Sequence, residues 1–426
     1  MKSLDWFAAA LLALFVAMPA LADDAKESGF VPMFDGQSLK GWVNVNCAPS
    51  TFFVKDNQII TTGKPTGYLR TEKQYENFIA EFDWMHIPPK PGEVGNSGFF
   101  VWADPIPAVG TGYTRGIEVQ VLVNLTYKNK KGEITATSQG DLFSIWGATC
   151  VPERPHPDGW ARCLPSENHC KGENEWNHYR VEANDGVIKL AVNGHFVSSV
   201  SKCKPRKGYL ALESEGSECR FKNLKIKALP STNPKQDEIC DIALGHKSLY
   251  TGLDLTGWKV DELTKKHWQP KNDMMLHYDG KGKELRTENE YGDVEYVVDF
   301  RFPQKGAHSC SFRLRTTDQG GLTLKYTSDG KHQTLEGWSK GTRIFSNESS
   351  QAPGGALVAK PAGQWNRQRL TQMPAKVGSN PGLRLTLNGS RTDFGLSGFA
   401  QPEKGALILE ADGPMDFANL FVRELK

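Results

Sequence analysis

The chain has 426 residues, enough for two or three domains that each bury a core. Its 51 basic and 49 acidic residues leave a net charge of +2, which excludes a strong electrostatic case for binding nucleic acid or an anionic membrane surface. We therefore expect no nucleic acid partner.

The N-terminal segment has the pattern of a secretory signal. Lys2 precedes the apolar run Phe7–Met18, and the small-residue ending Ala20-Leu21-Ala22 follows it. The run is too short to favour a membrane span, and no later run reaches about 18 apolar residues. We predict a signal peptide over residues 1–22, export to the periplasm or the extracellular space, and no integral membrane segment.

The chain contains the same pattern twice. Met33–Trp42 recurs as Leu249–Trp258, and Leu69–Glu72 recurs as Leu285–Glu288 at the same spacing. A unit of this length is far longer than a solenoid or propeller repeat, so it indicates a duplicated domain. We predict a first domain over residues 29–229, a polar linker with two prolines over 230–238 and a second domain over 239–426.

Short strand-like runs, separated by clusters of Gly, Pro, Asn and Asp, fill the first copy, and long helical periods are nearly absent. This pattern is typical of an all-β sandwich or barrel with antiparallel strands. The runs are Phe52–Val54, Phe78–Trp84, Gly98–Trp102, Ile117–Val123, Asp141–Trp146, His178–Ala183, Val187–Val192, Tyr209–Glu213 and Phe221–Ile226.

Differences between the copies single out candidate functional residues, because residues kept in both copies are expected to serve the fold. The first copy has Asn96 between Gly95 and Gly98, and the second copy lacks all three. Glycine permits close approach of a ligand to the backbone, although a bulge at a strand edge explains the pattern equally well.

Glu118 and Gln120 occur only in the first copy, where strand alternation places them on one face about 7 Å apart. The second copy has Thr323 and Lys325 at these positions. A Glu inside an apolar strand faces either solvent or a polar cleft. Burial in a cleft would raise its pKa and suit it to proton transfer.

Glu213 and Arg70 have counterparts in the second copy, which favours a structural role, but both remain candidates, as does Asp141. Aromatic rings also stack on sugars, although each is more often part of a core. The candidates of this kind are Trp102, Tyr113, Trp146 and Trp160.

An even number of cysteines, eight, in an exported chain predicts disulfides. The segment Cys163–Cys170, with Cys150 and His156 nearby, offers a zinc site as the alternative, but its spacing fits no common ligand pattern. We predict no metal and no cofactor.

The motifs Phe34-Asp35-Gly36, Gly95-Asn96-Ser97-Gly98, Glu118-Val119-Gln120, Gly140-Asp141-Leu142-Phe143 and Glu175-Trp176-Asn177 follow one another in the order of a known family. The chain resembles the 3-keto-disaccharide hydrolase domain, also described as a 3-keto-α-glucoside lyase or 3-keto-2-hydroxy-glucal hydratase domain. The match covers the whole first copy and the two ends of the second, which is degenerate.

This resemblance implies two tandem concanavalin A-like jelly rolls and carbohydrate chemistry in an exported protein. The hypothesis is net hydrolysis of a 3-keto-glycoside through C2 proton removal and β-elimination. Glu118 is the expected base, and Glu213 or Asp141 is the expected acid. Asn96 and Gln120 are expected to bind the sugar, with Arg70, Trp102 and Trp146 as further contacts.

Two alternatives remain open. A conventional glycosidase would use a carboxyl pair such as Glu118 and Glu213. A non-catalytic carbohydrate-binding or scaffolding protein would use the same fold without chemistry. The second copy, which lacks the Glu-x-Gln strand, is expected to be non-catalytic.

Overall fold

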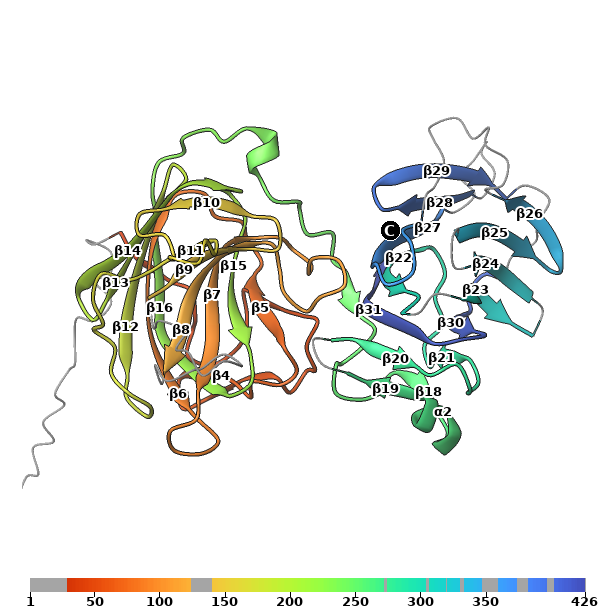
Figure 1. The fold of residues 1–426 in the computed structure, drawn as a ribbon, viewed down its shortest axis with the longest axis horizontal. Helices are drawn as coiled ribbons and strands as arrows, with labels where there is room; N and C mark the ends of the chain where they lie inside the picture. Colours follow the sequence, from red (N-terminus) through yellow and green to blue (C-terminus); the bar gives the residue numbers. More distant parts are fainter. Residues whose placement is uncertain are drawn as a thin grey trace, which may run out of the picture.

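The computed structural model describes residues 29–123, 140–271, 274–303, 306–318, 320–329, 333–346, 359–373, 382–396 and 402–425. Strands dominate these residues, and the predicted all-β fold of two tandem sandwiches is confirmed (Figure 1). The expected signal peptide over 1–22 lies outside the described residues. No helix in the described part of the chain is long and apolar enough to cross a membrane.

Two antiparallel sheets form the first domain. Its back sheet has the spatial order β10 (Thr149–Pro152), β14 (His195–Lys204), β13 (Val187–Val192), β12 (Asn177–Asn184), β6 (Phe78–Ile87), β16 (Glu218–Ala228), β4 (Gln58–Thr61) and β3 (Phe52–Lys55), with β1 (Val31–Pro32) paired to β16. Its front sheet has the order β11 (Arg162–Cys163), β9 (Leu142–Ile145), β8 (Gly116–Val123), β7 (Gly95–Ala103), β15 (Tyr209–Ser214), β5 (Gly67–Thr71) and β2 (Trp42–Val45).

The second domain repeats this plan. Its back sheet has the order β19 (Trp268–Pro270), β20 (Leu276–Tyr278), β31 (Met415–Glu424), β22 (Val294–Arg301), β27 (Asn366–Met373), β28 (Gly382–Leu387) and β29 (Ser390–Gly395), with β17 (Lys247–Ser248) paired to β31. Its front sheet has the order β18 (Trp258–Lys259), β21 (Leu285–Thr287), β30 (Ala406–Ala411), β23 (Ala307–Thr317), β24 (Gly320–Asp329), β25 (Gln333–Ser339) and β26 (Thr342–Ser346). The short helices η1 (Gln236–Glu238) and α2 (Glu262–His267) lie outside the sheets.

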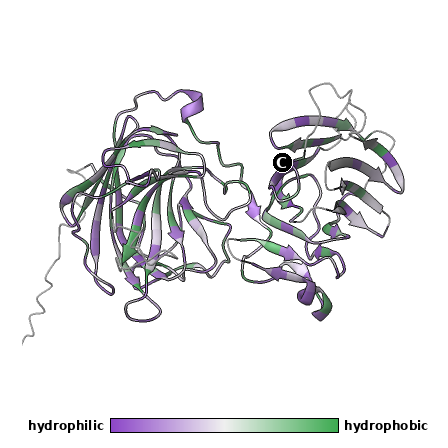
Figure 2. Ribbon diagram, viewed as in Figure 1, coloured by the Kyte–Doolittle hydropathy of each residue, from purple (hydrophilic) through white to green (hydrophobic). Residues whose placement is uncertain are grey.

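Alternation along the strands decides which side chains leave the core. On β8, Ile117, Val119 and Val121 are fully buried between the two sheets. Glu118 and Gln120 therefore lie on the opposite side, which we call the front face of the first domain. Figure 2 shows hydrophobic and hydrophilic residues interspersed along the strands, with η1 and much of α2 hydrophilic.

The two domains share a hydrophobic contact. Tyr68, Phe100 and Tyr209 on the front face of the first domain cluster with Val297 (β22) and Phe421 (β31) from the back sheet of the second. This part of the front face is covered by the second domain, so a site on the front face has to lie outside the cluster.

The prediction of disulfides is not supported, because all eight cysteines are free thiols in the structure. Most are buried and pack as small hydrophobic residues. Cys240 Sγ donates a hydrogen bond to the carbonyl of Trp102 at 3.1 Å. Burial raises the pKa of the Cys170 thiol to about 12. The buried cysteines therefore contribute to the hydrophobic packing of the domains.

Candidate active site on the front face of the first domain

Three neighbouring strands bring the candidate residues together. β8 carries Glu118 and Gln120, β15 carries Glu213, and β7 lies between them. Gly98 pairs with Gln120 on one side, and the pairing of Leu212 with Phe99 places Glu213 next to Gly98 on the other. Gln120 and Glu213 thus flank Gly98, while Glu118 pairs with Phe100 two residues further along β7.

Gly98 makes room for the Glu118 carboxyl. A β-carbon at Gly98 would lie 2.7 Å from Oε1 of Glu118 and 2.9 Å from its Cγ. Any other residue there would push the carboxyl off the sheet. Gly98 thus allows the Glu118 carboxyl to lie directly over β7.

Burial and negative neighbours favour the protonated forms of both glutamates. Glu118 is 5% exposed and Glu213 is 1% exposed. Burial, then the charge of Glu215, raises the pKa of Glu118 well above its usual range. Burial, then Glu118 and Glu215, raises the pKa of Glu213 in the same way. Arg162 opposes the shift only at Glu118.

Glu215 is a functional candidate that the sequence analysis missed. Asn96 Nδ2 donates to its Oε2 at 2.5 Å, and the Tyr113 hydroxyl donates to its Oε1 at 2.9 Å. Gln120 Nε2 donates in turn to Asn96 Oδ1 at 2.6 Å. Asn96 and Gln120 therefore form a chain of amides that leads from β8 to this third carboxylate. The second copy has Asp412 at the position of Glu215, so the comparison of copies gave no signal.

Asp141 lies at the β9 edge of the same cluster and forms an ion pair with Arg162, whose Nη1 lies 3.2 Å from Oδ2. The Arg162 guanidinium stacks over the Phe143 ring, with 4.5 Å between its Cζ and the ring centroid. A carboxylate paired with a guanidinium is a poor proton donor. Asp141 is thus better suited to fixing Arg162 than to the acid role expected for it.

The two tryptophan candidates differ in their location. Trp146 is half exposed, and its ring lies parallel to that of Tyr113, with centroids 6.2 Å apart. Trp102 is fully buried in the core, and its Nε1 donates to the Glu76 carbonyl at 2.8 Å. Alternation from Phe100 would put Trp102 on the front face. Its φ of +54°, beside the bulge between β7 and β15, turns the ring inward.

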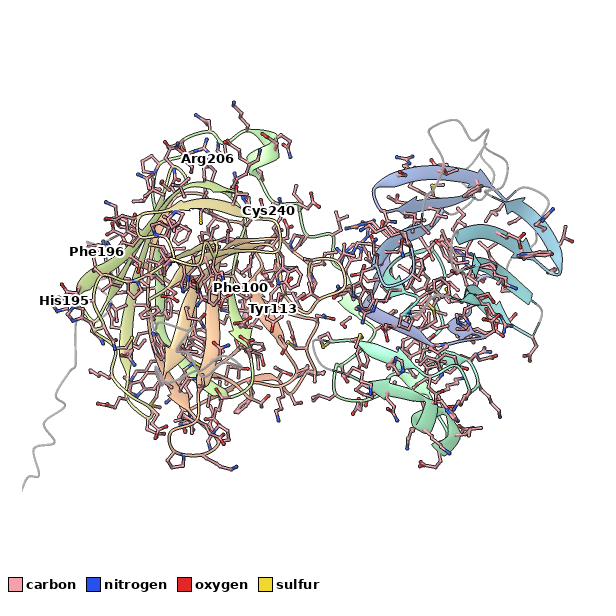
Figure 3. The ribbon with its side chains drawn as sticks, viewed as in Figure 1. Phe100, Tyr113, His195, Phe196, Arg206 and Cys240 are labelled. Atoms are coloured by element: carbon pink, nitrogen blue, oxygen red, sulfur yellow. The ribbon has the colours of Figure 1, made fainter. Side chains whose placement is uncertain are left out.

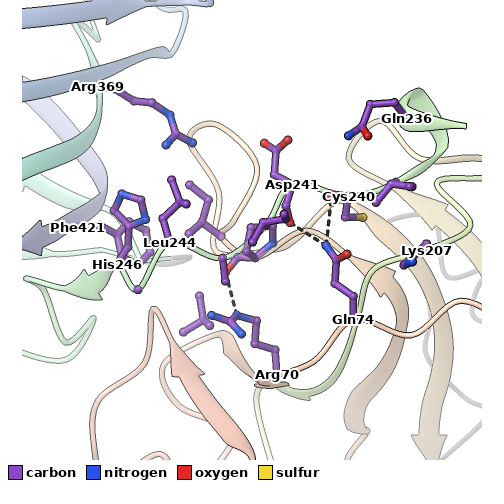
Figure 4. Close-up of a pocket in the computed structure, with 17 residues that line it drawn as sticks. Arg70, Gln74, Lys207, Gln236, Cys240, Asp241, Leu244, His246, Arg369 and Phe421 are labelled. Atoms are coloured by element: carbon purple, nitrogen blue, oxygen red, sulfur yellow. Dashed lines mark hydrogen bonds between the residues drawn. The ribbon is translucent and has the colours of Figure 1, made fainter. Parts of the chain in front are cut away.

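Arg70 also lies apart from the glutamates. In the order of the front sheet β5 is three strands from β8, roughly 14 Å at the usual strand spacing. The Arg70 guanidinium covers the Tyr209 ring and donates from Nε to the Pro105 carbonyl at 3.2 Å. It lines a cavity of about 610 Å³ at the junction of the domains, to which Arg369 and other residues contribute (Figure 4).

The structure therefore brings together Glu118, Gln120, Glu213, Asn96 and Asp141, with Trp146 at their margin, and separates Arg70 and Trp102 from them. Within the described residues, no three side chains of His, Cys, Asp or Glu are arranged to hold a metal ion. What the cluster offers chemically is two carboxyls whose pKa values are raised well above their usual range, beside a third that accepts two hydrogen bonds.

A model of the 3-keto-alpha-glucoside-1,2-lyase-like domain matches residues 29–227 and 245–423. A proposed glycosyl hydrolase from Parabacteroides distasonis is 22% identical over 50% of this chain and 99% of its own, with a TM-score of 0.40. A carbohydrate-binding module from Bacillus subtilis is 13% identical over 44% of this chain and 96% of its own, with a TM-score of 0.32.

The β-glucanase of Bacillus licheniformis is 11% identical over 40% of this chain and 94% of its own, with a TM-score of 0.31. No curated protein matches the chain. The family match covers both domains and most of the chain. The chain therefore belongs to the family of 3-keto-α-glucoside-1,2-lyase-like domains, of which it carries two tandem copies.

Proposed function

We propose that the first domain cleaves glycosides whose sugar carries a ketone at C3. The observation that carries this proposal is a pair of buried glutamates with unequal surroundings: the Glu118 carboxyl lies over Gly98, and Glu213 lies beside Gly98 on the next strand. The family supports a carbohydrate substrate, and the pair supports a reaction that needs one proton acceptor and one proton donor.

Glu118 is the base. The C3 ketone acidifies the C2 hydrogen, so the C2–H bond breaks with its proton going to Glu118 while the electrons form an enolate. Arg162 opposes the rise in the pKa of Glu118 and not that of Glu213, so Glu118 is the better proton acceptor of the two. A base with a pKa near the working pH is the most effective one.

Glu213 is the acid. Burial and the charges of Glu118 and Glu215 raise the pKa of Glu213, with no cation to oppose them. When the enolate collapses, the C1–O bond breaks and the leaving oxygen takes the Glu213 proton. A C1=C2 double bond remains next to the ketone. Addition of water, with the oxygen at C1 and a proton at C2, completes a net hydrolysis.

The remaining residues orient the sugar. The amides of Asn96 and Gln120 lie between the glutamates and Glu215, where they can meet the ketone or a ring hydroxyl. The parallel rings of Tyr113 and Trp146 offer an apolar flank for a pyranose face.

The test is a panel of 3-keto-disaccharides and the corresponding unmodified disaccharides, incubated with the full chain and with the double variant Glu118→Gln/Glu213→Gln. We expect cleavage of the keto sugars alone and its loss in the variant. Cleavage of the unmodified sugars would show a conventional glycosidase. Binding of sugars without any cleavage would show a binding protein.

We also propose that the chain is exported, with the apolar run Phe7–Met18 as the signal. N-terminal sequencing of the protein from its native cells is expected to find Asp23 at the mature terminus. A terminus at Met1 on protein retained inside the cells would contradict export.

A further inference from the structure

The 104–115 loop joins β7 to β8 in the first domain and has no equivalent of similar length in the second. There, β23 and β24 meet at the directly paired Thr317 and Gly320. Arg115 closes the base of the loop by donating from Nε and Nη2 to the Asp104 carboxylate, at 2.7 and 2.9 Å. A loop that one copy has and the other lacks is a candidate for a task specific to that copy.

Three polar residues on the back sheet of the second domain form what we call the clamp triad: Asp299, Arg367 and Asn419. Arg367 donates to both oxygens of Asp299, from Nε at 2.7 Å and from Nη2 at 2.8 Å. Asn419 Nδ2 donates to Asp299 Oδ2 at 2.6 Å. Asp299 and Asn419 are fully buried, so the triad is a fixed group with its bonding geometry set by all three members.

The clamp triad holds the backbone of the 104–115 loop. Arg367 Nη2 donates to the Pro107 carbonyl (2.8 Å), Asn419 Nδ2 to the carbonyls of Ala108 (3.0 Å) and Thr111 (3.1 Å), and the Gly110 amide donates to Asp299 Oδ2 (2.8 Å). Gly110 has a φ of +74°, and a β-carbon there would overlap the Trp365 ring. The loop is thus shaped to the surface of the second domain.

The first domain has an equivalent group with His178 in place of Arg367, and among the described residues no loop backbone is hydrogen-bonded to its side chains. His178 Nδ1 and Asp83 Oδ1 lie 2.7 Å apart, and Asn223 Nδ2 donates to Asp83 Oδ2 at 2.6 Å. The side chains of His178 and Asp83 are partly exposed. The Asp–Asn pair is therefore a framework feature of the fold, and the second domain differs in having Arg367 where the first has His178 and in using the group to hold a loop.

Near its C-terminal end the 104–115 loop carries Tyr113, whose side chain is part of the candidate active site. Tyr113 follows Thr111 by two residues, and its amide donates to Thr111 Oγ1 at 3.2 Å. Its hydroxyl donates to Glu215, and its ring lies parallel to Trp146. Figure 3 shows Tyr113 on the side of the first domain that faces the second. The loop is thus held by the second domain at one end and by the carboxylate cluster at the other.

We propose that the second domain positions the active site of the first, with Asp299, Arg367 and Asn419 acting as positioning residues through the 104–115 loop and Tyr113. The second copy is then retained for this task, without chemistry of its own. This inference rests on the proposed function for its effect on catalysis, while the holding of the loop itself is independent of the substrate.

The test compares Asp299→Asn with Asp83→Asn, the same substitution at the equivalent position of the first domain. Hydrogen exchange of the full chain is expected to be at least about tenfold faster in the 104–115 loop of Asp299→Asn, because the Gly110 amide loses its charged acceptor. Asp83→Asn is expected to leave that loop as in the wild type. If Asp299→Asn does not fold, Arg367→His, which keeps a partner for Asp299 but loses the donor to Pro107, takes its place.

Activity on a 3-keto-disaccharide separates positioning from general stability. Tyr113→Phe is expected to lower kcat/KM about ten- to a hundredfold, and Asp299→Asn about tenfold, with Asp83→Asn within about twofold of the wild type. The double variant Asp299→Asn/Tyr113→Phe is expected to match Tyr113→Phe alone, since both changes act through one side chain.

Multiplicative losses in the double variant, or equal exchange in Asp299→Asn and Asp83→Asn, would overturn the inference. A wild type that cleaves none of the sugars would instead overturn the proposed function. The hydrogen-exchange measurement would then decide alone whether the clamp triad holds the loop. Faster exchange of the 104–115 loop in Asp299→Asn would support this role, and unchanged exchange would reject it.

Discussion

The front sheets of the two domains have the same strand order, but different side chains occupy the equivalent positions on their front faces. In the first, Glu118 lies over Gly98 and faces Glu213. In the second, the register places Thr323 at the position of Glu118 and Ser311 at that of Gly98. Glu213 has a counterpart in Glu410, but that side chain is 48% exposed and lies 3.9 Å from Arg313.

The difference shows that a carboxyl in a given strand position is not by itself a catalytic group. Glu213 and Glu410 share a register position, yet only Glu213 is buried among other carboxyls, and there its pKa is raised. Burial, missing countercharge and a glycine beside the pair create the site. Each of these conditions can be removed separately in the first domain, with the second domain as the control.

The largest effect is expected from Glu118→Gln. Without the base, kcat/KM on a 3-keto-disaccharide is expected to fall by about 10²–10⁴. Thr323→Ala, the matched change in the second domain, is expected to leave the rate within about twofold. Steady-state kinetics of the two full-length variants measure this, and an unchanged rate in Glu118→Gln would remove Glu118 from the role of base.

Gly98→Ala is expected to come next. The new methyl group would meet Glu118 Oε1 at 2.7 Å and displace the carboxyl. We expect kcat/KM to fall about ten- to a hundredfold, in line with the cost of misplacing a reacting group by about 1 Å. Ser311→Ala is the control. Equal rates for both variants would mean that the Glu118 carboxyl does not work from its position over β7.

The sequence alone predicted that Glu118 and Gln120 lie on the face away from the core, because alternate side chains of a strand point to opposite faces of the sheet. The sequence also identified Asn96 as a candidate, because the second copy lacks an asparagine at that position. It was not sufficient for Trp102, because a bulge with a positive φ reverses the alternation and no local signal marks it.

Arg162 and Glu215 could not be identified from the sequence for a different reason: contacts between distant parts of the chain place them at the site. Arg162 lies on the two-residue strand β11, outside any regular pattern. Glu215 is joined to the site by Asn96 and by Tyr113, and the loop of Tyr113 is held by a domain more than a hundred residues further along the chain. Pairings of this kind follow from the packing of the two domains, which alternation within a strand does not encode.

A third prediction concerns the pH dependence. If Glu118 is the base, kcat/KM rises with pH through its pKa, because the ionised form accepts the proton. Arg162 lowers this pKa, so Arg162→Gln is expected to move the rising limb to higher pH. At a fixed pH below the limb, the rate is expected to fall about tenfold if the limb moves up by about one pH unit. Arg313→Gln in the second domain is the control. An unchanged pH profile in Arg162→Gln would contradict an effect of Arg162 on the pKa of Glu118.

The smallest effect is expected on stability. The pKa of Glu213 is raised in the folded chain, so the native state holds this proton to higher pH than the unfolded state does. The contribution of Glu213 is thus most favourable below the pKa of an unfolded glutamate and is lost as pH rises through the folded pKa. Glu213→Gln removes this loss, so urea unfolding at pH 8 is expected to show a gain of about 1 kcal/mol that disappears towards pH 4.

Glu410→Gln, at the same register position of the second domain, is expected to show no such gain, because its side chain is half exposed and lies near Arg313. If the two variants changed stability equally at both pH values, the contrast between the front faces would not be one of burial and charge. A gain at pH 8 confined to Glu213→Gln, together with loss of activity, would instead mean that the first domain keeps a destabilising carboxyl because the reaction needs it.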